Sequence, residues 1–213
     1  MNELKSSMNT LDVPYYNQTR FYTCGPAALM MVMKYWDNTV ELSRKTEYKL
    51  WLMSNPFVFF GGTLQFGLAK TAVHIGFKAK IFQKARFSKY HKNKPRLFNF
   101  IENIISRGAR HAKVPIYYGE DILEMIQEAL YKGIPPIVFL NLDPIIGENV
   151  FHWLVVTGLD KNKAYVNDPY IPYGSMLEKK KDHPIDLEIF KKAISTDSRK
   201  KIHLPPCTIL VYK

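Results

Sequence analysis

Residues 18–36 read QTRFYTCGPAALMMVMKYW, and this stretch decides how the fold is built. From Ala27 onward every residue of the stretch except Lys34 is apolar, so a helix here has no polar face and must be buried. Pro26 fits the first turn of such a helix, because the N–H that proline lacks has no partner there in any case. The stretch therefore predicts a buried helix that begins at Cys24 and runs to the end of the stretch.

Cys24 stands at the N-terminus of this predicted helix, where the surroundings favour a thiolate. Backbone N–H groups without helical partners point outward there, and the helix dipole adds partial positive charge. Both effects stabilise the thiolate, which is the nucleophilic form of cysteine. Gln18 lies six residues earlier (24 − 18 = 6), and its amide could donate to an oxyanion at the same place. The alternative is that Cys24 is one more buried small residue, as most free cysteines are.

A second segment favours the catalytic interpretation. Residues 151–169 read FHWLVVTGLDKNKAYVNDP, which predicts a β-hairpin with a polar turn at residues 160–163. The returning strand brings Asp168 beside His152, which pairs a base with a carboxylate that orients its ring. Asn167 competes for that position, but neighbouring strand residues face opposite ways, and we expect Asp168 to face His152. A histidine alone would be read as a core residue; next to Asp168, it is a candidate base for a cysteine.

Together the two segments resemble the C39 and C39-like peptidases. These are papain-fold cysteine peptidases, and their best-known members trim double-glycine leader peptides from bacteriocin precursors. The resemblance implies an α+β fold in which N-terminal helices, including a buried catalytic helix, pack on an antiparallel sheet. It also implies roles for four residues: Cys24 as nucleophile, His152 as general base and acid, Asp168 as orienting carboxylate and Gln18 as oxyanion donor.

The rest of the chain predicts helices first and antiparallel strands later, which is an α+β pattern. The predicted helices cover residues 40–53, 63–75, 120–132 and 185–194, and the predicted strands cover residues 78–83, 134–142 and 208–212. Residues 63–82 and 121–142, each a helix followed by a strand, resemble the middle of a C39 domain. We expect Thr63 to cap its helix. A chain of 213 residues can bury one substantial core, so we expect a single domain over residues 1–213.

The distribution of apolar residues along the chain predicts where the protein is located. No run of eighteen apolar residues is present to span a membrane, and the N-terminus has no apolar signal core, so we expect a cytoplasmic protein. No transporter follows in this sequence, so we do not expect the double-glycine substrate to carry over.

The six histidines are scattered, and we expect no metal and no other cofactor. Cys207 is expected to face the core from the last strand; a disulfide with Cys24 is the competing idea, which a reducing cytosol disfavours.

Residues 84–118 look like a basic insertion in a minimal C39 domain. They hold nine lysines and arginines and one acid, Glu102, which is +8 of the net charge of +11. Basic residues interleaved with aromatic ones can bind nucleic acid, an anionic membrane surface or an acidic polypeptide. A solvated surface segment without a dedicated partner is equally consistent with this composition. We expect residues 97–105 to form a short helix that docks the segment onto the body.

The sequence therefore predicts a cysteine peptidase that acts on a peptide or protein substrate. Hydrolysis of a peptide or isopeptide bond would proceed through an acyl-enzyme on Cys24. Two alternatives remain: an acyltransferase or transpeptidase with the same triad, and a non-catalytic module that binds a peptide or nucleic acid. The enzyme is favoured because Cys24, His152 and Asp168 are all present, whereas a degenerate relative is expected to have lost at least one.

Overall fold

The computed structural model describes residues 10–55, 62–170, 181–196 and 203–213. The strands are β1 (Lys78–Gln83), β2 (Ile116–Tyr118), β3 (Ile137–Asn141), β4 (Phe151–Leu159), β5 (Lys163–Asn167), β6 (His183–Asp186) and β7 (Cys207–Tyr212). The helices are α1 (Cys24–Trp36), α2 (Arg44–Ser54), α3 (Gln65–His74), α4 (Phe87–Tyr90), α5 (Pro95–His111), α6 (Ile122–Tyr131), α7 (Asp143–Ile146) and α8 (Leu187–Ile194). None of the helices in these ranges is both long enough and apolar enough to cross a bilayer.

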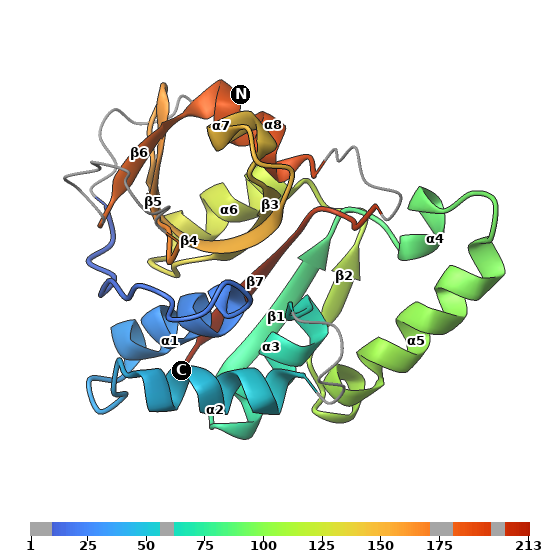
Figure 1. The fold of residues 1–213 in the computed structure, drawn as a ribbon, viewed down its shortest axis with the longest axis horizontal. Coiled ribbons are helices and arrows are strands. Elements are labelled where there is room, and N and C mark those ends of the chain that lie inside the picture. Colours follow the sequence, from blue (N-terminus) through green and yellow to red (C-terminus); the bar gives the residue numbers. More distant parts are fainter. Residues whose placement is uncertain (1–9, 56–61, 171–180, 197–202) are drawn as a thin grey trace.

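The strands form one seven-stranded sheet in the order β2-β1-β7-β3-β4-β5-β6 (Figure 1). All neighbours run antiparallel except β1 and β2, which are parallel. The sheet is antiparallel as expected except at this edge, where the expectation is wrong. A parallel pair requires a crossover connection, and α4 and α5 supply it between β1 and β2. The α+β class itself is confirmed.

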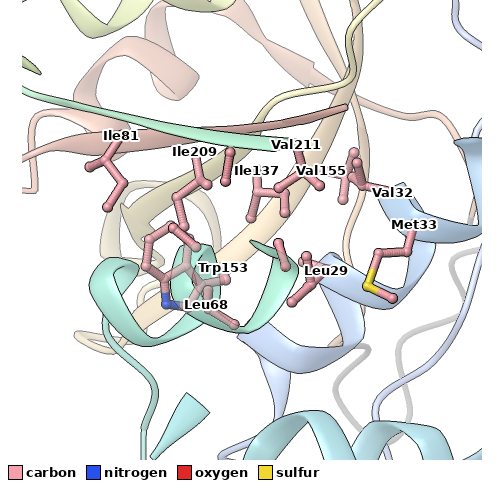
Figure 2. Close-up of a cluster of buried hydrophobic side chains, with 14 of the residues drawn as sticks. Leu29, Val32, Met33, Leu68, Ile81, Ile137, Trp153, Val155, Ile209 and Val211 are labelled. Atoms are coloured by element: carbon pink, nitrogen blue, oxygen red, sulfur yellow. The ribbon is translucent and has the colours of Figure 1, made fainter. Parts of the chain in front are cut away.

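Helices cover both faces of the sheet, and β4 contributes to both cores. Helices α1 and α3 lie on one face and α6 and α8 on the other (Figure 1). Trp153 and Val155 point into the core beneath α1 and α3, while Leu154 and Val156 point into the opposite core. Figure 2 shows the first of these cores, in which Leu29 from α1 lies with side chains from the strands. The period-2 alternation of a strand produces this arrangement.

The expected helix at Cys24 is confirmed, and Gly25 lets its first turn approach the sheet. A Cβ atom at Gly25 would lie 3.0 Å from Leu68 Cδ1 and 3.2 Å from Trp153 Cδ1. A larger residue would push the start of α1 away from β4. Because His152 precedes Trp153 in β4, this close approach also brings Cys24 towards His152.

The expected starts of α2 and α3 are both wrong. α2 begins at Arg44 rather than residue 40, because the Ser43 side chain accepts from Thr46 N and caps the helix there. Thr63 does not cap α3, since Leu64 occupies the cap position. The Thr63 hydroxyl accepts from Asn55 Nδ2 at 2.9 Å instead, so it joins the segments on either side of residues 56–61.

Several other helices and strands also differ from the elements expected from the sequence. β3 begins at Ile137 rather than residue 134, because Pro135 and Pro136 have no N–H to give to a ladder. α8 begins after residue 185, because the Asp186 side chain accepts from two N–H groups of its first turn. α5 spans 17 residues, well beyond the expected range 97–105. α4, α7, β2 and β6 were not expected, and three or four residues are too few to establish a period.

Candidate active site

Cys24 and His152 lie where the N-terminus of α1 meets the start of β4. Cys24 is the first residue of α1, and His152 is the second residue of β4, on which α1 packs. Both side chains are nearly enclosed, with 7% of Cys24 and 4% of His152 exposed. The sulfur and the imidazole interact: the charge of Cys24 and a hydrogen bond to Cys24 are among the causes that raise the pKa of His152.

Asp168 makes the second contact to the imidazole. His152 Nε2 lies 2.6 Å from Asp168 Oδ1. The same oxygen accepts from Tyr170 N at 2.7 Å, which fixes the carboxylate at the end of β5. Asn167 turns elsewhere: its amide donates to Val13 O at 2.9 Å and accepts from Asp182 N at 2.8 Å. Asp168, and not its neighbour, is therefore the residue on the histidine.

These surroundings favour the charged imidazolium. Burial by itself lowers the pKa of His152, but the charges of Asp168 and Cys24, and hydrogen bonds to both, raise it from 6.5 to about 10. Since Asp168 holds Nε2, the ring nitrogen that remains for Cys24 is Nδ1. An imidazolium between a carboxylate and a sulfur stabilises the thiolate form of that sulfur.

Gln18 is anchored next to the same segment. Its backbone N–H donates to Pro169 O at 2.8 Å, one residue beyond Asp168. Its side-chain Nε2 donates to Arg20 O at 2.8 Å, which orients the amide and leaves the second hydrogen on Nε2 for another acceptor. Gln18 Oε1 is buried and has no hydrogen-bond partner among the described residues.

The first turn of α1 supplies further free donors. Thr23 occupies the cap position of α1, but its side chain makes no capping hydrogen bond. Within the described parts of the chain, no acceptor is recorded for the N–H of Cys24. The Cys24 N–H and the Gln18 amide lie at the two ends of one short loop, and both are hydrogen-bond donors of the kind that stabilises an oxyanion.

Glu47, on α2, is the residue of this site that the sequence analysis missed. It is 1% exposed, and its carboxylate accepts four hydrogen bonds from the loop that precedes α1. The donors are the Tyr16 hydroxyl (3.1 Å), Thr19 N (2.9 Å), the Thr19 hydroxyl (2.6 Å) and the Thr23 hydroxyl. Because Thr23 adjoins Cys24, Glu47 ties the loop that carries Gln18 and Cys24 to α2.

A signal for Glu47 is present in the sequence. The buried residues of α2 are Glu47, Leu50, Trp51 and Ser54, spaced as one helix face. Glutamate is almost never fully buried unless it is paired. An acid in register with an apolar face is therefore a candidate for a structural or functional hydrogen-bond network, although its donors cannot be identified from periodicity.

Glu47→Gln is expected to loosen the loop before Cys24. An amide has one acceptor oxygen where the carboxylate has two, so buried donors of the loop lose partners, at about 1–3 kcal/mol. We expect a lower Tm and slower alkylation of Cys24. Thermal unfolding and the rate of iodoacetamide labelling measure both effects, with the exposed Glu41→Gln as the matched control. Unchanged Tm and labelling rate in Glu47→Gln would contradict this role.

The two cysteines are expected to differ sharply in reactivity. Both are free thiols, and burial raises the pKa of Cys207 on β7, which is 1% exposed. Near pH 6 we expect iodoacetamide to modify Cys24 about 100-fold faster or more, because only the thiolate reacts. Peptide mass mapping over time measures the two rates, and Cys207→Ala should leave the Cys24 rate unchanged. Equal rates for the two thiols would contradict an activated Cys24.

Comparisons with known proteins identify the family and the fold. A family model described as "Peptidase_C39 like family" matches residues 13–202. No curated protein sequence matches the chain. Among solved structures, a protein described as a C39-like peptidase from Bacillus anthracis has a TM-score of 0.56 at 15% identity, over 97% of this chain and 98% of that chain. This likeness indicates a shared fold.

Two further solved structures are similar at lower TM-scores. The peptidase domain of Streptococcus ComA, described as a bifunctional ABC transporter, has a TM-score of 0.49 at 18% identity, over 93% of this chain and 96% of that chain. A double-glycine-motif protease from an AMS/PCAT transporter, solved with a leader peptide, has a TM-score of 0.46 at 18% identity, over 97% of this chain and 96% of that chain.

Proposed function

Since this chain belongs to the Peptidase_C39-like family, we propose that it is a cysteine peptidase that hydrolyses a peptide or isopeptide bond. One observation carries the proposal: His152 is held by Asp168 at 2.6 Å and interacts with Cys24 at the N-terminus of a buried helix. This is the nucleophile, base and orienting group that covalent catalysis by cysteine requires. We also propose that the chain acts as a single domain that includes the basic segment 84–118.

Acylation would begin from the thiolate–imidazolium pair. The Cys24 sulfur attacks the carbonyl carbon, and the carbonyl oxygen becomes an oxyanion that accepts from the Gln18 amide and the Cys24 N–H. The intermediate collapses as the C–N bond breaks, and the His152 imidazolium gives its proton to the leaving amine. The product of this half-reaction is a thioester on Cys24 and a free amine.

Deacylation would return the enzyme to its starting state. His152, now neutral, takes a proton from water, and the resulting hydroxide attacks the thioester carbonyl. The C–S bond breaks, the carboxylic acid product leaves, and the thiolate again faces an imidazolium. Asp168 keeps the ring oriented through both halves and stabilises its positive charge.

Acyl transfer is the second candidate, and the enclosure of the site favours it. With 7% of Cys24 and 4% of His152 exposed, the thioester would have little contact with water. An amine that binds in place of water would then accept the acyl group through the same steps. Transfer and hydrolysis share the first half-reaction and differ only in the nucleophile of the second.

A peptide library tests the proposed function. Peptides from a digested proteome are incubated with the wild-type protein or with Cys24→Ala, and new termini are identified by mass spectrometry. Cuts made by the wild type and absent with Cys24→Ala support a peptidase; cuts common to both contradict it. A parallel reaction with glycinamide separates the two candidates, because transfer yields glycinamide adducts in excess of free carboxyl termini.

A further inference from the structure

Helix α5 has apolar residues on two sides: Phe98, Ile105 and Ala109 pack with the core, and a second set faces away from the protein. Its inner side carries Glu102 and Ser106, which are fully buried. Its outer side carries Leu97, Phe100 and Ile104, which are 47%, 62% and 50% exposed. These three residues lie three and four positions apart and form one stripe along the helix, called the α5 stripe below. A surface helix ordinarily has an apolar face only towards the core, so this second, exposed apolar stripe is unusual.

The orientation of α5 is held by a buried polar network. Glu102 accepts from Gln83 Nε2 at 3.0 Å and from Phe87 N at 3.1 Å. Rotating α5 to bury its stripe would strip this carboxylate of both donors inside the protein, which is strongly unfavourable. The exposed stripe is therefore a built-in feature of the fold. Helix α5 itself lies at the outer edge of the molecule, beyond β2 at the end of the sheet (Figure 1).

Between residues 84 and 118, every exposed lysine, arginine, aspartate or glutamate is a lysine or an arginine. All nine lysines and arginines between residues 84 and 118 are exposed, and the only acid of that range is the buried Glu102. Arg96 precedes Phe100 by four residues and Arg107 follows Ile104 by three, so these two guanidinium groups flank the stripe on one side. Apolar residues bordered by cations are the pattern of a helix that lies on an anionic membrane.

A cationic recess adjoins the first turn of α5. It has a volume of about 500 Å³ and is lined by Lys89, Lys92 and Lys94 together with the rings of His91 and Phe98. His91 stacks on Phe98 with ring centroids 3.5 Å apart, which gives the recess an aromatic wall. Three lysines around a recess of this size provide donors and positive charge for phosphate groups.

We propose that the α5 stripe and the lysines of residues 89–94 form a docking surface for an anionic membrane. Leu97, Phe100 and Ile104 enter the boundary between headgroups and acyl chains, and the surrounding cations contact lipid phosphates. The docked protein lies on the bilayer without spanning it. This surface is separate from Cys24, so the proposal stands independently of the catalytic one.

Two other partners fit the surface less well. A bound peptide buries its apolar side chains in a groove, whereas the exposed side of a single helix is convex and suits a flat layer. Single-stranded nucleic acid stacks its bases on aromatic rings, whereas two of the three stripe residues, Leu97 and Ile104, are aliphatic. A second copy of the chain would meet the same dense positive charge on both partners, which disfavours self-association.

Vesicle flotation tests the docking surface directly. The full chain is mixed with vesicles of phosphatidylcholine alone or of phosphatidylcholine with phosphatidylglycerol. We expect the wild-type protein and Cys24→Ala to float equally with the anionic vesicles, to remain unbound with the neutral ones, and to dissociate as salt rises. Phe100→Ser/Ile104→Ser and Lys92→Ser/Lys94→Ser should each weaken binding by about tenfold or more.

Matched control variants remove the same kinds of side chain from exposed positions outside residues 84–118. Phe21→Ser/Tyr131→Ser removes two rings that are each 85% exposed, and Lys49→Ser/Lys161→Ser removes two exposed cations. Both control variants should bind anionic vesicles like the wild type. Absence of binding to anionic vesicles, equal binding to neutral vesicles, or equal losses in test and control variants would each overturn the proposal. So would a wild-type dimer that Phe100→Ser/Ile104→Ser converts to monomer, since the stripe would then be a self-association interface.

Discussion

Cys24→Ala is expected to lower kcat/KM by about 10⁴-fold or more, to the level of the uncatalysed reaction plus binding. The variant removes the atom that forms the acyl-enzyme, and no other thiol can replace it, because Cys207 is buried on β7 and its pKa is raised by that burial. The measurement is turnover of a peptide found in the library experiment. A near-normal Tm for Cys24→Ala would show that the loss is chemical.

Cys207→Ala is the matched control for the nucleophile. It removes the same side chain from another buried position, so it should lower the Tm slightly and leave kcat/KM within a factor of a few. If Cys24→Ala retained more than about a tenth of the wild-type kcat/KM, Cys24 would not be the nucleophile.

Asp168→Asn is expected to have the second-largest effect, a fall in kcat/KM of roughly 10²- to 10⁴-fold. Asparagine keeps an oxygen for Tyr170 N but removes the negative charge that helps to raise the pKa of His152 to about 10. Burial then dominates, and the pKa of His152 falls. The alkaline limb of the profile of kcat/KM against pH, which follows loss of the imidazolium proton, should therefore move to lower pH.

The raised pKa of His152 also makes the free energy of unfolding depend on pH. The pKa of His152 is higher in the folded protein, about 10, than its ordinary value of 6.5. The contribution of the ion pair to the free energy of unfolding is therefore full below about pH 6.5 and is lost as pH rises towards 10. The difference in Tm between the wild type and Asp168→Asn should shrink over that range.

The turn of the same hairpin provides the control for Asp168. Asp160 accepts from Asn162 N and Lys163 N at the opposite end of β4 and β5. Asp160→Asn also removes one carboxylate, but it should leave the pH profile of kcat/KM where it is. A profile shifted equally by the two substitutions, or by neither, would contradict an orienting carboxylate at Asp168.

The parts of the fold that could be predicted have strong local patterns. The helix at Cys24 follows from an apolar run with proline in its first turn, and its predicted bounds agree with α1. The hairpin follows from a β-branched run and a polar turn, and β4 and β5 occupy the expected positions. The resemblance to C39-like peptidases, carried by those two segments, is confirmed by the family model over residues 13–202.

The parts that could not be predicted depend on tertiary contacts. Thr63 was a plausible helix cap, but its backbone oxygen accepts from Trp153 Nε1 across the core at 2.8 Å. Glu47 acts through donors 24 to 31 residues away, and no periodic pattern reports such a distance. β2 pairs with β1 only because α5 carries the chain across the edge of the sheet. The outward stripe of α5 also depends on the buried Glu102, which composition alone could not locate.

A thiol-reactive peptide tests the central claim most directly. The protein is treated with a peptidyl chloromethyl ketone, and intact-mass spectrometry follows the adduct as the reagent concentration rises. The account predicts a single adduct, located on Cys24, with a rate that saturates as the peptide fills the site and that falls sharply in His152→Ala. The denatured protein is the control, in which both cysteines should react. If the folded protein then forms no adduct on Cys24, or forms its first adduct on Cys207, the result would contradict a cysteine peptidase built on Cys24 and His152.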